Sequence, residues 1–147
     1  MQMSVLIIET NRMMAATLEQ CVYQIAGELD MVIRPISMVF ITRELALRVL
    51  TGDILDQFDL CVMNWSALGA DVVRQIKRAM PSVRICALGE TAGGNWLVEA
   101  LDAGANITLP KDPEQMFPAL KHYINEYALL LEALEEVTEV DPHPIIQ

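Results

Sequence analysis

Hydrophobic residues fall into two patterns along this chain: short continuous runs, and longer stripes that repeat every three or four residues. Continuous runs are typical of strands buried on both faces of a parallel sheet, and stripes are typical of helices that lie on such a sheet. The two patterns alternate. They predict strands at 5–8, 31–36, 60–63, 83–88 and 107–109, and helices at 12–29, 43–50, 71–80, 96–103 and from 113 onwards.

Strands that alternate with helices predict a parallel sheet with right-handed crossovers and helices on both faces. Pro35 falls inside the second strand and has no N–H to donate, so this strand is expected at an edge of the sheet. An edge position for the second strand fits the order 2-1-3-4-5. The expected fold is therefore α/β, a flavodoxin-like doubly wound five-stranded parallel sheet with an extended C-terminal helix.

The last helix carries the longest apolar stripe of the chain. Asp112 and Pro113 form a cap followed by proline at the first helical position, but Pro118 leaves open a bend or a later start. A heptad-like seam of this kind favours association between helices, and we expect a homodimer through it. The alternative is that its leucines fold back on their own domain. The predicted interface residues are Phe117, Leu120, Ile124, Tyr127, Leu130, Leu131 and Leu134.

Composition and charge narrow the classes of function. The chain is 53% hydrophobic, yet no apolar run approaches the roughly 20 residues that span a bilayer. The N-terminus lacks the features of a signal peptide, and the three cysteines show no metal-like spacing. A net charge of −10 makes binding to nucleic acid or to an anionic membrane unfavourable. We therefore expect a cytoplasmic protein with reduced cysteines and no metal or cofactor.

Polar residues and a glycine stand at the carboxyl ends of four predicted strands. These strand ends meet at one edge of the sheet, which is where open α/β sheets place their sites. The residues are Glu9, Thr10, Asn64, Gly89, Glu90 and Lys111.

In these positions the chain resembles the receiver domain of bacterial two-component response regulators. The resemblance covers roughly residues 4–126 and is carried by residues 5–9, 59–64, 100–105 and 109–111. It implies a domain over residues 1–127. The last helix then continues over 128–138 as a dimerisation element, and residues 139–147, with two prolines, are expected to be an irregular tail or linker.

The resemblance also implies roles for the strand-end positions. In the family, two acids after the first strand bind Mg²⁺ and an aspartate at the end of the third strand accepts a phosphoryl group from phosphohistidine. A Thr or Ser after the fourth strand and a Lys after the fifth hold the phosphate. Here Glu9 keeps one acid, Thr10 replaces the other, and Asn64 replaces the acceptor. Gly89 or Glu90 stands in place of the hydroxyl residue, and only Lys111 matches.

These departures remove the chemistry of the family. Only a carboxylate can become an acyl phosphate, and Mg²⁺ prefers carboxylate oxygens. Loss of two of three acids changes the charge of the acidic set from roughly −3 to −1, too little to hold Mg²⁺. We therefore predict a degenerate, pseudo-receiver pocket. Lys111 is expected to form an ion pair with Glu9 or a hydrogen bond with Asn64, because a buried ammonium without a partner is costly.

Two tryptophans are expected beside this pocket. Either an indole covers the pocket as a lid or presents a surface to a partner, or Trp65 and Trp96 pack as loop residues, and packing is favoured. No catalytic pair or triad is visible, and His122 and His143 are isolated.

The sequence thus predicts a non-enzymatic signalling module that binds an unidentified protein partner. It would act alone or as the regulatory domain of a larger response or transcription regulator. The alternative is a sensor of a nucleotide or another small anionic ligand.

Overall fold

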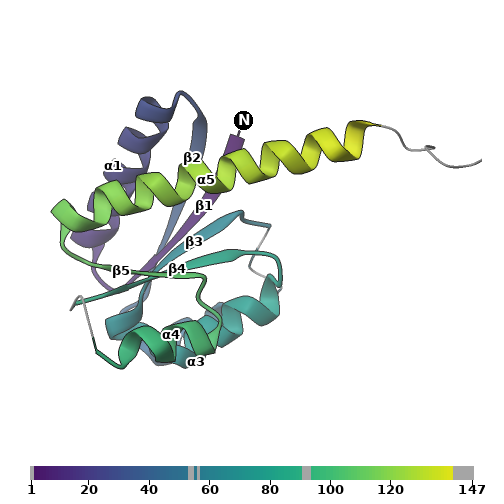
Figure 1. The fold of residues 1–147 in the computed structure, drawn as a ribbon. Helices are drawn as coiled ribbons and strands as arrows, with labels where there is room; N and C mark the ends of the chain where they lie inside the picture. Colours follow the sequence, from purple (N-terminus) through teal and green to yellow (C-terminus); the bar gives the residue numbers. More distant parts are fainter. Residues whose placement is uncertain (1, 53–54, 56, 91–93, 141–147) are drawn as a thin grey trace, which may run out of the picture.

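The computed structural model describes residues 2–52, 55, 57–90 and 94–140, which form a five-stranded parallel sheet (Figure 1). The strand order is β2-β1-β3-β4-β5, as predicted. Every adjacent pair is parallel, so the carboxyl ends of the strands share one edge. The strands are β1 (Gln2–Glu9), β2 (Val32–Val39), β3 (Leu60–Asn64), β4 (Arg84–Gly89) and β5 (Ile107–Pro110).

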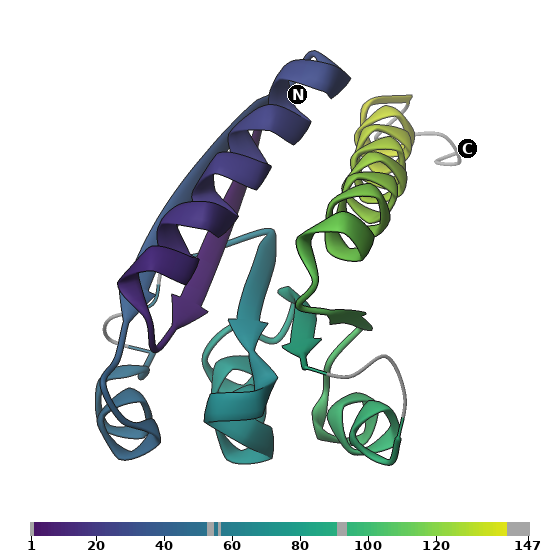
Figure 2. The ribbon, with the colours of Figure 1, turned by 90° about the vertical axis from the view of Figure 1, so that its left-hand side faces the viewer.

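Five helices cover the two faces of the sheet. They are α1 (Arg12–Leu29), α2 (Arg43–Val49), α3 (Trp65–Ala79), α4 (Trp96–Ala103) and α5 (Pro113–Val140). Figure 2 shows α1 and α5 on one face and α2, α3 and α4 on the other. Each face has its own buried apolar cluster, and β1, β3 and β4 contribute alternate residues to both. These strands therefore need the continuous apolar runs from which they were predicted.

The edge position of β2 is confirmed. Among the described strands β2 pairs only with β1, and Pro35 lies opposite Val5. Both β1 and β2 are longer than predicted. Ser37, in the part of β2 beyond the apolar run, donates a hydrogen bond of 2.6 Å to Glu19 of α1. Pairing with β1 thus extends the strand past the point where its hydrophobic pattern ends.

Helix α3 begins at Trp65, six residues before its predicted start at Asp71. The segment before that predicted start is instead a helical turn, because the Asn64 side chain accepts a hydrogen bond from the Ala67 N–H at 3.2 Å and caps it. Gly69 then breaks the helical geometry with φ of 74°. Glycine is favoured at a positive φ because it has no Cβ atom, so Gly69 allows the kink between the first turn and the rest of α3.

Helix α5 begins at Pro113, which decides between the two predicted starts. The Asp112 carboxylate accepts a hydrogen bond from the Glu114 N–H at 3.2 Å, and Pro118 lies inside the helix. The helix continues past the sheet (Figure 1) and includes residues 139 and 140, which were predicted to be tail. Residues 141–147 of that predicted tail lie outside the described part of the chain. No described helix has the length and apolar character needed to cross a bilayer.

The prediction that the whole apolar seam of α5 forms an interface was wrong for its first half. Leu120 and Ile124 are fully buried in the cluster that α1 and α5 share with the sheet. Partly buried residues of α5, namely Phe117, Tyr127 and Leu131, pack against the same cluster. By contrast, the exposed fractions of Leu130 and Leu134 are 44% and 54%. The seam therefore first covers the sheet and reaches the surface only near its end.

Candidate functional site

A pocket of about 290 Å³ lies at the carboxyl edge of the sheet. It is formed where β1, β3, β4 and β5 end, as expected for an open α/β sheet. Of the predicted strand-end residues only Gly89 does not line it. The polar lining residues used below are Glu9, Thr10, Asn64, Ser66, Glu90 and Lys111.

A buried hydrogen bond between Glu9 and Asn64 forms the floor of this pocket. Asn64 Nδ2 donates to Glu9 Oε1 at 2.7 Å, and the Thr10 N–H donates to the same oxygen at 2.8 Å. Glu9 is fully buried and Asn64 is 4% exposed. Asn64 Oδ1 caps α3, so the oxygen of this amide is hydrogen-bonded as well as its nitrogen. An aspartate here would offer no N–H and would place a second carboxylate against Glu9.

Lys111 does not form the contact that we predicted for it. Within the described residues it makes no ion pair with Glu9 and no hydrogen bond with Asn64, so this prediction was wrong. Its side chain remains half-exposed at the pocket, where water can solvate the ammonium group. Its backbone N–H donates to the Gly89 carbonyl at 2.8 Å. Lys111 therefore lines the pocket without neutralising the buried carboxylate.

Ser66 belongs to the pocket and was not predicted. Its hydroxyl accepts a hydrogen bond from the Glu90 N–H at 3.1 Å, which joins the first turn of α3 to the segment after β4. Its position two residues beyond Asn64, at a carboxyl strand end, was the available signal. It was missed because residues 65–70 lay between the predicted strand and the predicted helix, where the direction of a side chain is not fixed by a regular element.

Neither tryptophan covers the pocket. Trp65, the first residue of α3, is buried in the apolar cluster on the face that α2, α3 and α4 cover, and Trp96 packs against the same cluster. The ring of Trp96 also lies over Gly89, and a Cβ atom at residue 89 would be 2.5 Å from its Cζ2 atom. Packing, the favoured alternative, is thus confirmed, although both tryptophans pack from the first positions of helices α3 and α4 and not from loops. The same contact leaves no room for a Thr or Ser side chain at Gly89.

Substitution of Gly89 with alanine is expected to lower the free energy of unfolding by about 1–3 kcal/mol, because the new methyl group would meet the rigid indole of Trp96. Urea unfolding followed by circular dichroism measures this. Gly27→Ala is the control, since a Cβ there meets nothing within 4 Å. In helix α1 that change should stabilise by about 0.4–1 kcal/mol. Equal stabilisation by both substitutions would contradict the packing of Trp96 on Gly89.

The residues at this pocket do not fit the Mg²⁺ ion that the family resemblance implies. Mg²⁺ is held through carboxylate and water oxygens. Here Glu9 Oε1 already accepts hydrogen bonds from two N–H groups, and residue 64 presents its NH₂ group to that carboxylate. The described residues contain no group of three or more His, Cys, Asp or Glu that could hold a metal.

The two cysteines of the sheet offer no nucleophile. Cys61 and Cys86 are fully buried inside β3 and β4. Burial raises the pKa of the Cys86 thiol to about 12, and it also raises the pKa of the Cys61 thiol. Both thiols therefore stay protonated at neutral pH and are unreactive.

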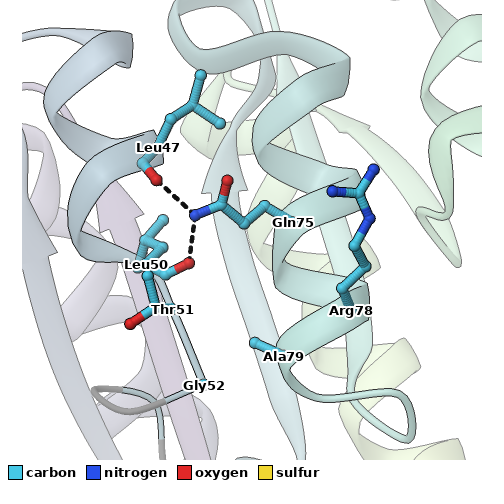
Figure 3. Close-up of a pocket in the computed structure, with 7 residues that line it drawn as sticks. All are labelled: Leu47, Leu50, Thr51, Gly52, Gln75, Arg78 and Ala79. Carbon is cyan, nitrogen blue, oxygen red and sulfur yellow. Dashed lines mark hydrogen bonds between the residues drawn. The ribbon is translucent and has the colours of Figure 1, made fainter.

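A second cavity, of about 500 Å³, lies between α2 and α3 (Figure 3). Gln75 of α3 crosses it and donates to the Leu47 carbonyl at 2.6 Å and to the Leu50 carbonyl. The Leu47 carbonyl belongs to the last turn of α2 and Leu50 is its C-cap residue, a region where helical partners are missing. Gln75 therefore closes the end of α2, and its amide is used for structure.

Comparisons with known proteins support the fold. No protein-family model and no curated protein matches the sequence. A pilus assembly-related protein of Burkholderia pseudomallei is 19% identical with a TM-score of 0.70, covering 86% of this chain and 90% of that chain. A response regulator receiver domain protein of Clostridium thermocellum is 16% identical with a TM-score of 0.68, covering 90% and 98%.

A third similar structure is a response regulator of Burkholderia pseudomallei that contains a phosphorylated aspartic acid and a calcium ion. It is 18% identical with a TM-score of 0.62, and the match covers 93% of this chain and 75% of that chain. Identities this low establish the fold alone. Together with the strand order and the position of the pocket, they show that this chain has the receiver-domain fold of response regulators.

Proposed function

We propose that this chain is a receiver-type signalling module that is not phosphorylated and acts through protein–protein contacts, including self-association. The chain would have the same role as the regulatory domain of a larger response or transcription regulator. The module would be recognised by its partners through its surface, without a covalent change at the pocket.

The hydrogen bond between Asn64 and Glu9 is the observation that carries this proposal. Asn64 occupies the position at which the family's aspartate receives the phosphoryl group, and a carboxamide cannot form an acyl phosphate. Its nitrogen is held by the buried Glu9 carboxylate and its oxygen by the start of α3. Residue 64 is thus a structural link between β1, β3 and α3.

Incubation with acetyl phosphate and Mg²⁺ is expected to leave the intact mass of the protein unchanged, because residue 64 offers no acceptor. The double variant Thr10→Asp/Asn64→Asp restores the family's acids and serves as the control for the reagent. A stoichiometric, hydroxylamine-sensitive gain of one phosphoryl group on the unmodified sequence would overturn the proposal.

A sensor of anionic ligands is the less favoured function. The pocket carries two carboxylates, Glu9 and Glu90, against one ammonium group on Lys111. An anion would therefore enter a site with a net negative charge. A thermal-shift screen with nucleotides, with Lys111→Ala as control, is expected to show no stabilisation.

Self-association is supported by the end of α5. Helix α5 continues past the sheet with Leu130 and Leu134 exposed, and an isolated helix gains by covering such residues (Figure 1). Light scattering at tens of micromolar protein is expected to give twice the mass of the chain.

Replacing Leu134 with glutamate is expected to weaken the dimer by at least about tenfold, since each 1.4 kcal/mol lost corresponds to that factor. Leu129→Glu is the matched control. Leu129 is 58% exposed, but its side chain points about 100° away from Leu130 and about 140° away from Leu134 around the helix, so its effect should stay within about twofold. Sedimentation equilibrium measures both constants. Equal weakening by the two substitutions would remove α5 as the interface.

A further inference from the structure

One row of side chains on α5 lies between the side of the helix that packs on the sheet and the side that faces solvent. It consists of Tyr123, Tyr127, Leu130 and Leu134, which we call the α5 stripe. Spacings of four, three and four residues place these side chains on one face of the helix. Both tyrosines are half-buried against the sheet, and both leucines are exposed. The stripe is thus aromatic and partly covered at one end, and aliphatic and open at the other.

A hollow of about 240 Å³ lies at the aromatic end of the α5 stripe. It is lined by Arg84, Glu126 and the residues Tyr123, Tyr127 and Leu130 of the stripe. The Arg84 guanidinium lies over the Tyr127 ring, 5.2 Å from its centroid. Tyrosine and arginine are the residue types that most often anchor protein interfaces. The single positive and single negative side chains leave the hollow without net charge.

The spacing of the α5 stripe reads the same in both directions along the helix. An antiparallel second copy therefore meets it residue for residue, with Leu134 opposite Tyr123 and Leu130 opposite Tyr127. Leu130 and Leu134 of each copy then reach the hollow of the other copy, so the pair contains two equivalent contacts. A parallel copy instead sets tyrosine against tyrosine and leucine against leucine, and leaves both hollows empty.

The charges of α5 favour a second copy as the occupant. Glu132 and Glu136 are exposed and, at 100° per residue, lie on the opposite side of the helix from the α5 stripe. Pairing through the stripe therefore leaves both of these side chains in water, and it covers Glu126 at a hollow that also contains Arg84, which matters for a chain with a net charge of −10. A basic partner would be drawn to the acidic side and would leave the stripe uncovered.

We propose that two copies of this chain pair antiparallel through the α5 stripe, each inserting Leu130 and Leu134 into the hollow beside Arg84 of the other. The arrangement is isologous, so one surface supplies both halves of the contact. It rests on the self-association proposed above and adds the orientation of the helices.

Distances between spin labels test the orientation. His122→Cys and Glu136→Cys, each in a Cys21→Ser background, carry labels outside the stripe at exposed positions. In the antiparallel pair, residue 122 of one copy lies level with residue 136 of the other, whereas two labels at 136 are offset by about 22 Å along the helices. Pulsed electron resonance on a mixture of the two variants should therefore give a shorter distance than either variant alone.

The outcomes separate this inference from the proposed self-association. A monomer by light scattering would overturn both. A dimer whose mixed distance is the longest would keep self-association and overturn the antiparallel arrangement. A dimer in which all three distances are long would place the interface elsewhere and would overturn it as well.

Discussion

Replacing Asn64 with alanine is expected to lower the free energy of unfolding by about 3 kcal/mol, the combined loss of a helix cap and of a hydrogen bond to a charged group. The substitution removes the N–H that Glu9 Oε1 receives at 2.7 Å and leaves a fully buried carboxylate with fewer partners. It also frees the Ala67 N–H at the start of α3. Chemical unfolding in urea, followed by circular dichroism, measures the change.

Asn11→Ala is the matched control for this prediction. Asn11 caps α1 through hydrogen bonds from the Met13 and Met14 N–H groups, but it is exposed, and these hydrogen bonds of its side chain involve no carboxylate. Its loss should cost about 1 kcal/mol, the usual value of a cap. If the two substitutions cost the same, the contact with Glu9 contributes nothing and the structural role assigned to Asn64 is wrong.

Replacing Ile124 with alanine is expected to cost about 3–4 kcal/mol, because it opens a cavity in a fully packed core. Ile124 is fully buried between α5, α1 and the sheet. Leu129→Ala, on the same helix and 58% exposed, should change the free energy of unfolding by no more than about 0.5 kcal/mol.

The two measurements are made at a protein concentration where light scattering shows the monomer, so that dimerisation does not add to stability. A small effect of Ile124→Ala under these conditions would mean that the first half of α5 is held by a second copy, as the heptad pattern alone suggested.

The sheet was predictable from the sequence because its interior strands are covered on both faces. Continuous apolar runs such as 60–63 are typical of strands that are buried on both faces of a parallel sheet. Pro35 indicated which strand lies at the edge. The start of α3 was not predictable, because it depends on Asn64, whose amide is fixed by Glu9 from another strand. Contacts between residues distant in sequence decide such boundaries.

The heptad pattern of α5 was ambiguous for a physical reason. A helix that packs on a sheet and one that packs on a partner helix both place apolar residues three and four positions apart. Only the structure shows that Leu120 and Ile124 serve the sheet, while Leu130 and Leu134 remain exposed. Whether those two residues form an interface stays a prediction.

The candidate site was predictable as a set of positions, but not as a set of contacts. Parallel strands bring Glu9, Asn64 and Lys111 to one edge whatever their side chains do. Which of them bond depends on how each side chain is placed: among the described residues Asn64 donates to Glu9 and Lys111 does not. The packing of Trp96 on Gly89 could not be predicted for the same reason, because this contact depends on the orientation of one side chain.

Calorimetric titration with Mg²⁺ tests the absence of phosphorylation chemistry most directly, because phosphoryl transfer in the family depends on that ion. The unmodified protein is expected to bind no Mg²⁺ at physiological, millimolar concentrations, while Thr10→Asp/Asn64→Asp regains a site. Stoichiometric binding of Mg²⁺ by the unmodified protein in this range, abolished by Glu9→Gln, would contradict the account.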